Sequence, residues 1–222
     1  MRAAGVLKAA AVGGATLALA ACDGLVTRDD SAVIVLTDVS GTYFEELDDA
    51  VRGAKLLTAS LNAGDRLVVA EIGSCSFDDR AIALDARFPD RPSEAAAARA
   101  GALTTLDAYQ AGAARSDYTD IHGALLQAVD RLSRSDASRR VVVIFSDLVE
   151  DPAPGCGSAN APLNLDGVTV IAANVIKLRA DAEAPDAYFA RIEAWRDKVE
   201  SAGGAWRLVD DVEALRSAAA GA

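Results

Sequence analysis

The chain contains only one histidine, three cysteines and few aromatic residues. A zinc site built on imidazoles needs more than one of them, so the single His122 nearly excludes such a site, and we expect this residue to have a packing or surface role. Aromatic residues make up 5% of the chain, whereas hydrophobic residues make up 51%. The core must therefore consist mainly of Val, Leu, Ile and Ala.

Two common catalytic motifs are missing, and positive charge is scarce. The sequence contains neither the Gly-x-Ser-x-Gly elbow of a serine nucleophile nor a glycine-rich phosphate loop ending in Lys-Ser/Thr. The net charge is −11, with 22 Lys and Arg against 33 Asp and Glu. Such an acidic surface repels phosphates, so we do not expect nucleic acid as a partner. It suits cations or basic partners, although most of these carboxylates serve solubility.

The N-terminus has the layout of a targeting signal. Arg2 and Lys8 precede an uncharged apolar run over residues 9–21, which is shorter than the roughly 20 residues that a membrane-spanning helix needs. Residues 1–21 are therefore predicted to be a cleavable signal peptide. The run ends in Leu19-Ala20-Ala21-Cys22, which resembles the lipobox of bacterial lipoproteins, where the signal is cut before the cysteine and the thiol is acylated.

The lipobox resemblance implies that residues 22–31 comprise a lipidated Cys22 and a short tether. The domain would then lie in the cell envelope, anchored to a bacterial membrane and facing the periplasm or the exterior. Several acyl chains on one residue give stable anchoring, because each buried CH₂ contributes ~0.8 kcal/mol. Asp23 resembles a signal for inner-membrane retention in some enteric bacteria, a rule that varies between bacteria. The alternative is an ordinary secretory signal next to a cysteine that occurs there by chance.

Residues 32–218 show strands alternating with helices, in a length that suits one domain. Apolar runs predict strands at 32–37, 66–72, 140–146, 168–176 and 205–209, and an alternating segment predicts an edge strand at 80–88. Helical spacing predicts helices at 44–62, 93–114, from 119 or 120 onward, 185–202 and 210–218. The alternation predicts a three-layer α/β fold with a mostly parallel central sheet, one antiparallel edge strand and helices on both faces.

Three polar segments lie where predicted strands end or a helix begins. Asp38-Val-Ser-Gly-Thr42 follows the first strand, Thr119 precedes a helix, and Asp147 follows the strand at 140–146. Ligands of open α/β sheets bind at the carboxyl ends of the strands, so we expect these side chains to share one rim. Hydroxyl and carboxylate oxygens are hard donors that suit Mg²⁺, Mn²⁺ or Ca²⁺ better than zinc.

These segments resemble the metal-ion-dependent adhesion site of the von Willebrand factor A (VWA) domain family. That site has Asp-x-Ser-x-Ser/Thr after the first strand, a Thr before a later helix and an Asp closing a hydrophobic strand. The matching positions, in order, are Asp38, Ser40, Thr42, Thr119 and Asp147. The resemblance covers nearly the whole domain and implies a Rossmann-like fold. It also implies that the hydroxyls hold a divalent cation, most often Mg²⁺, that the aspartates hold metal-bound waters, and that the ion binds an Asp or Glu of a partner protein.

Two positions depart from the family pattern. Leu148 stands where the family usually has glycine after the last Asp, and Ser116-Asp117-Tyr118 stands where glycines often precede the Thr. Neither change removes a ligand, but both alter the shape of a loop. Both therefore bear on metal affinity and on the choice of partner.

Three functions stay open, because each site residue also suits a turn or a helix cap. The first is a membrane-anchored, metal-dependent protein-binding module without catalytic activity. The second is a metal-free scaffold lipoprotein of the envelope. The third is a Mg²⁺-dependent phosphatase similar to the haloacid dehalogenases, with Asp38 as nucleophile. Ser40 stands where those enzymes carry a general-acid Asp, which argues against the third.

Two further cysteines, Cys75 and Cys156, follow predicted strands and are expected at the same rim. An exported compartment permits disulfides, so we predict a bond between them, with two free buried thiols as the alternative. Such a bond would stabilise the fold by about 2–4 kcal/mol.

Overall fold

The central strand of the fold, β1 (Ser31–Asp38), is buried along its whole length. The computed structural model describes residues 30–158 and 161–222, so the predicted signal peptide, Cys22 and most of the tether lie outside the described residues. β1 pairs in parallel with two neighbours, β2 (Arg66–Ile72) and β4 (Arg139–Phe145). Strands that are covered on both faces read as continuous apolar runs, which is the pattern of all three.

The complete sheet has six strands in the order β3-β2-β1-β4-β5-β6. The remaining strands are β3 (Ile82–Arg87), β5 (Val168–Ala173) and β6 (Ala205–Val209). β3 runs antiparallel to β2 at one edge, and all other pairs are parallel. The predicted mostly parallel sheet with one antiparallel edge strand is confirmed.

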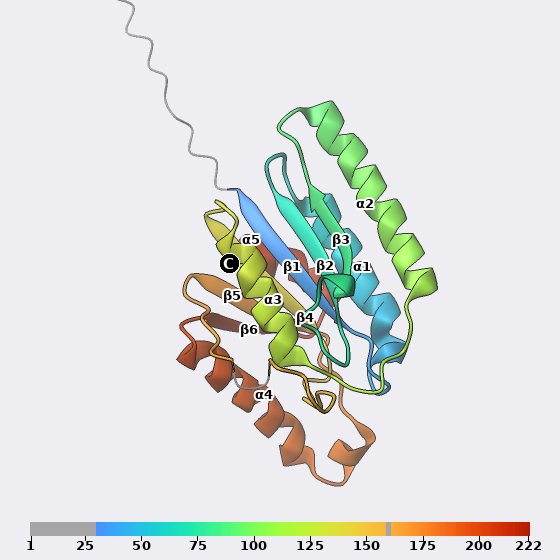
Figure 1. The fold of residues 1–222 in the computed structure, drawn as a ribbon, viewed down its shortest axis with the longest axis vertical. Helices are drawn as coiled ribbons and strands as arrows, with labels where there is room; N and C mark the ends of the chain where they lie inside the picture. Colours follow the sequence, from blue (N-terminus) through green and yellow to red (C-terminus); the bar gives the residue numbers. More distant parts are fainter. Residues whose placement is uncertain (1–29, 159–160) are drawn as a thin grey trace, which may run out of the picture.

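Helices cover both faces of the sheet (Figure 1). One hydrophobic core joins the sheet to α1 (Leu47–Ser60), α2 (Pro92–Gly112) and α5 (Leu215–Ala220). A second core joins the opposite face to α3 (Ile121–Ser133) and α4 (Pro185–Ser201). The predicted three layers are confirmed, and the described residues hold the whole sheet and both cores. Among these residues, no helix has the length and apolar character needed to cross a bilayer.

Several predicted boundaries were wrong by one to three residues, and three elements illustrate the differences. β1 begins one residue earlier than expected, at Ser31. β5 stops at Ala173 rather than at residue 176, because Asn174 adopts a left-handed conformation (φ 51°) that turns the chain out of the sheet. The segment 210–218 is not one helix: a 3-10 turn at Val212–Ala214 precedes α5, and the side chain of Asp211 accepts the N–H of Glu213 to begin that turn.

Gly53 allows α1 to approach the sheet closely. A Cβ at this position would overlap the ring of Phe145, the fully buried last residue of β4. We expect Gly53→Ala to destabilise the protein, because the clash outweighs the gain of up to ~1 kcal/mol in helix propensity. Urea-induced unfolding would measure the change.

A matched control lies on α2, where a Cβ at Gly101 would meet nothing within 4 Å. Gly101→Ala should stabilise the protein by ~0.5–1 kcal/mol. Equal effects of the two substitutions would contradict the close contact between α1 and β4.

Candidate metal-binding site

The loop after β1 presents two hydroxyls side by side. Asp38 Oδ1 accepts the N–H of Ser40 at 2.8 Å, which forms a tight turn of the kind that aspartate favours. The carbonyl of Ser40 then accepts the N–H groups of Tyr43 and Phe44, at 3.2 and 2.9 Å. This turn leaves Ser40 Oγ and Thr42 Oγ1 3.4 Å apart.

The end of β4 completes the cluster. Thr42 Oγ1 donates to Asp147 Oδ2 at 2.6 Å, and Ser146 Oγ donates to Asp38 Oδ2 at 2.5 Å. β1 and β4 are neighbours, so their carboxyl ends bring both aspartates and both hydroxyls together. Ser146 was not among the predicted site residues. The only signal for it was a polar residue closing an otherwise apolar strand.

Leu148 occupies a backbone position that favours glycine. Its φ is 63°, in the left-handed region where glycine is free of strain. The leucine is held there because its side chain is buried in the core formed with α3 and α4, and its carbonyl accepts the Trp195 indole N–H at 2.9 Å. Its own N–H donates to Ser146 Oγ at 3.0 Å. The departure from the family pattern therefore leaves the loop in the conformation that a glycine would give.

Thr119 lies in the adjoining loop. Its backbone pairs with that of Asp151 through two hydrogen bonds of 2.8 and 2.9 Å. Nearby in the same loop, the N–H of Ser116 donates to the carbonyl of Val39 at 2.7 Å, within the turn that follows β1. In the part of the chain that the structure describes, no hydrogen bond joins the Thr119 hydroxyl to the other four predicted ligands. The structure thus gathers four of the five residues into one bonded cluster and puts the fifth in a neighbouring strand-like segment.

The loops around the site are joined to one another. Asp120 caps α3 by accepting the N–H of Gly123 at 2.8 Å, and it also accepts the N–H of Ser76 and the hydroxyl of Ser158. A disulfide links Cys75 and Cys156, whose Cα atoms are 5.5 Å apart. The loops that follow β2 and β4 are therefore fixed to the start of α3, beside Thr119.

Comparisons with known proteins identify the fold. No protein-family model and no curated protein matches the sequence. The structure is similar to a von Willebrand factor type A protein from Catenulispora acidiphila, with a TM-score of 0.53 at 12% identity, over 86% of this chain and 41% of that one. The protein has a von Willebrand factor A fold.

Two further structures share this VWA fold. One is an aerotolerance-related membrane protein from Bacteroides fragilis NCTC 9343, with a TM-score of 0.52, 14% identity and coverage of 86% of this chain and 97% of that one. The other is the D319A mutant of the PilB minor pilin from Streptococcus sanguinis, with a TM-score of 0.53, 10% identity and coverage of 90% and 62%. The chain spans less than two thirds of the pilin and of the Catenulispora protein.

The candidate site is electrostatically negative. The pKa of Asp38 is raised to about 6, mainly by burial and to a smaller extent by the nearby Asp147, while hydrogen bonds from Ser146 and Ser40 oppose the shift. Among the described residues, no ion pair involves either aspartate. Two carboxylates close together without a cationic partner favour a bound cation, which would lower their mutual repulsion.

The oxygens of the candidate site fit a hard divalent cation. Adjacent ligands of an octahedral Mg²⁺ are ~2.9 Å apart, since each lies 2.0–2.1 Å from the ion. The two measured oxygen separations, 3.4 Å between Ser40 and Thr42 and 2.6 Å between Thr42 and Asp147, bracket that value. The described residues contain no group of three or more His, Cys, Asp or Glu side chains suited to a metal. Any ion here would therefore depend on hydroxyl ligands.

The raised pKa of Asp38 predicts that its charged form lowers the stability of the metal-free domain, and that this effect depends on pH. A carboxyl with a folded pKa of about 6, against 3.8 when unperturbed, favours folding when protonated, and this contribution is lost as the pH rises through about 6. The shift corresponds to about 3 kcal/mol. We therefore expect Asp38→Asn to raise the free energy of unfolding in EDTA by about 1–3 kcal/mol at pH 7.5, and by clearly less at pH 5.

Urea-induced unfolding of both forms at the two pH values would test this. The difference between variant and native protein isolates Asp38 from other titrating groups. A variant that is less stable than the native protein at pH 7.5 would contradict the inferred cost of burying this charge.

Proposed function

We propose that the protein is a membrane-anchored VWA module that uses a divalent cation to bind a protein partner, and we expect this cation to be Mg²⁺. The observation that carries the proposal is the bonded cluster of Asp38, Ser40, Thr42 and Asp147, in which hydroxyls from one loop meet a carboxylate from another. Thr42 is exposed, so a partner can reach this cluster.

The roles of the side chains follow from their contacts. Ser40, Thr42 and Thr119 would hold the ion, while Asp38 and Asp147 would act mainly through metal-bound waters. Asp38 orients the hydroxyl pair through its bond to the Ser40 N–H. The ion would supply positive charge that hydroxyl ligands do not neutralise, and this charge would attract an Asp or Glu side chain of the partner.

We propose a binding role rather than a catalytic one. Asp38, the residue corresponding to a phosphatase nucleophile, is fully buried, and both of its carboxylate oxygens accept hydrogen bonds from the protein. A nucleophile must instead be able to reach the substrate, and a carboxylate buried in this way is shielded from it. This geometry supports the binding module over the phosphatase.

Anchoring through a lipidated Cys22 would place the module in the cell envelope. The fold neighbours include proteins described as a membrane protein and a minor pilin, which supports a location in the envelope or at the cell surface. A metal-free scaffold lipoprotein would have the same fold and anchor but would bind its partner without an ion. A measurement of metal binding therefore distinguishes the two functions.

Thermal unfolding of the chain from residue 24 onward tests metal binding directly. We expect Mg²⁺ to raise the melting temperature relative to EDTA, because an ion that binds only the folded state stabilises it by ~2.7 kcal/mol at a concentration of 100 Kd. The double variant Ser40→Ala/Thr42→Ala should lose this rise.

The control is Thr104→Ala/Thr105→Ala, which removes two hydroxyls from the exposed face of α2 and should keep the rise. Mn²⁺ and Ca²⁺ would be tested in the same way. No shift with any of the three ions would favour the metal-free scaffold.

An assay with a generic aryl phosphate ester and Mg²⁺ tests the absence of phosphatase activity. We expect no hydrolysis above the rate without protein, since the buried carboxylate of Asp38 is shielded from a substrate. Hydrolysis that depends on Mg²⁺ and disappears in Asp38→Asn would overturn the binding role.

A further inference from the structure

The two ends of β1 face opposite sides of the molecule. The candidate metal site follows Asp38, whereas the chain enters the fold at Ser31. The seven steps from Ser31 to Asp38 separate the two ends by about 23 Å. From Cys22, eight residues lead to Asp30 and span at most ~28 Å. A lipid on Cys22 would therefore hold the entry end within ~28 Å of the bilayer, and the surface of that end would decide how the domain is oriented.

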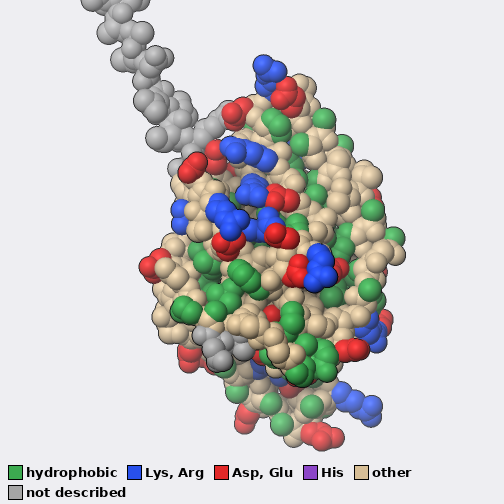
Figure 2. All heavy atoms as spheres, in the orientation of Figure 1, with side chains coloured by type: hydrophobic (Ala, Val, Ile, Leu, Met, Phe, Trp, Pro, Cys, Tyr) green, Lys and Arg blue, Asp and Glu red, His purple; other side chains and the backbone are tan. Residues whose placement is uncertain are grey.

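Arginines form a row across this entry end. Arg66 opens β2 and pairs in register with Arg87, the last residue of antiparallel β3. Ala32 of β1 pairs with Arg66 on one side and with Arg140 on the other, so Arg66, Arg87 and Arg140 lie on one face of the sheet. Arg139 pairs with Ser31 and lies at the same end on the opposite face. Figure 2 shows Lys and Arg side chains gathered, with some acidic ones, on the part of the surface where the chain enters.

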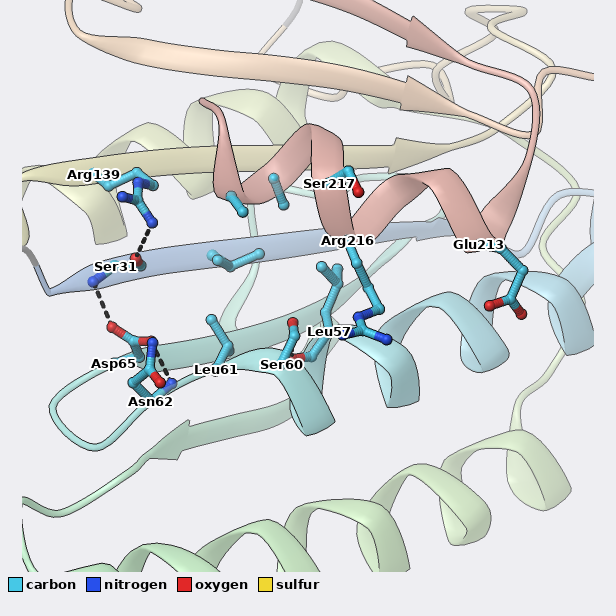
Figure 3. Close-up of a pocket in the computed structure, with 13 residues that line it drawn as sticks. Ser31, Leu57, Ser60, Leu61, Asn62, Asp65, Arg139, Glu213, Arg216 and Ser217 are labelled. Carbon is cyan, nitrogen blue, oxygen red and sulfur yellow. Dashed lines mark hydrogen bonds between the residues drawn. The ribbon is translucent and has the colours of Figure 1, made fainter.

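Three of these arginines have no carboxylate partner among the described residues: Arg87, Arg139 and Arg140. By contrast, Arg66 is paired with Asp85 at 2.6 Å. Among the described residues, the guanidinium of Arg139 donates only to the hydroxyl of Ser31, at 3.3 Å. It lies at the entry end of a hollow of about 480 Å³ between α1 and α5 (Figure 3). Their guanidinium groups thus remain available to an outside anion.

The carboxylates are distributed unequally between the two ends. At the entry end, Asp65 is buried, with its oxygens bonded to the N–H groups of Ser31 and Asn62 at 2.7 and 2.6 Å. Other carboxylates of this end are half-buried or exposed, namely Asp30, Asp90, Glu94, Asp136 and Asp166, but the arginines of the same end offset much of their charge, and Arg91 is paired with Glu94. At the metal-site end, acidic residues crowd the loops that follow the parallel strands and the first turn of α1. They are Glu45, Glu46, Asp48, Asp49, Asp117, Asp147, Glu150, Asp151, Asp210 and Asp211. An anionic surface would repel that end and tolerate the other.

We propose that the entry end is a bilayer-binding surface that takes the headgroups of anionic phospholipids through Arg87, Arg139 and Arg140. A guanidinium fits phosphate oxygens with paired hydrogen bonds, and basic side chains next to an anchor strengthen attachment to anionic lipid. The surface orients the domain with its entry end on the bilayer and the metal site facing away from it. The inference rests on the anchor at Cys22 in the proposed function.

Hydrogen–deuterium exchange on vesicle-bound protein tests the surface. The chain from Cys22 onward would be coupled through that thiol to a maleimide lipid, the other two cysteines being joined in the disulfide. Vesicles would contain phosphatidylcholine alone or mixed with phosphatidylglycerol, in EDTA. We expect slower exchange in segments 62–66, 87–91 and 133–140 on the anionic vesicles, lost in high salt and in Arg87→Gln/Arg139→Gln/Arg140→Gln.

The matched control is Arg179→Gln, which removes an arginine without a carboxylate partner among the described residues, away from the row; it should keep the slower exchange. Equal exchange on both kinds of vesicle would overturn the proposal, as would slowing confined to the loops at 39–44 and 148–158. Chemical coupling makes the result independent of lipidation in the cell. Membrane fractionation of the full chain and its Cys22→Ala variant tests that anchor separately, so the two failures are distinguishable.

Discussion

The buried carboxylate of Asp38 is the constraint around which the site is arranged. A carboxylate withdrawn from water must have its oxygens bonded, or it becomes protonated. One oxygen takes the N–H of Ser40 and the other takes the hydroxyl of Ser146, so the same side chain fixes the turn after β1 and joins it to the end of β4. These bonds compensate only part of the cost of burial, since the pKa still rises to about 6. A cation beside Asp38 and Asp147 would supply the remaining compensation.

The rim that surrounds this cluster is held by interactions that do not touch a metal. Asp120 bonds three separate segments, the disulfide joins two loops, and Thr119 pairs with Asp151 along the backbone. Such cross-linking lowers the number of conformations that the loops must lose when a partner binds, which favours affinity. The two backbone hydrogen bonds between Thr119 and Asp151 also couple the positions of these residues. The fifth predicted ligand is therefore positioned by the loop after β4 as well as by its own helix.

The sequence predicted the layers and the mostly parallel sheet because buried parallel strands leave continuous apolar runs, a signal that does not depend on distant contacts. It failed where the backbone conformation of single residues decides the outcome, as at Asn174, which ends β5. Asp38 and Asp147 could be predicted because charged residues directly after apolar strands are conspicuous. Ser146 was missed, since a serine that closes a strand looks like any turn residue until its partner is known. The pairing of Thr119 with Asp151 depends on how two loops meet, which residue spacing does not encode.

The acidity of the chain creates a conflict that the topology can resolve. Carboxylates near the metal site favour a cation, but the same charges would be repelled by an anionic bilayer. In a parallel sheet, the loops after the strands all lie at one end, and the start of β1 lies at the other. Acidic residues can therefore collect around the site while arginines occupy the edge where the chain enters, about one strand length away. At physiological ionic strength that separation is about three Debye lengths, so each end experiences mainly its own surroundings. A lipid-anchored tether ahead of β1 would therefore leave the acidic rim at the end that faces away from the bilayer.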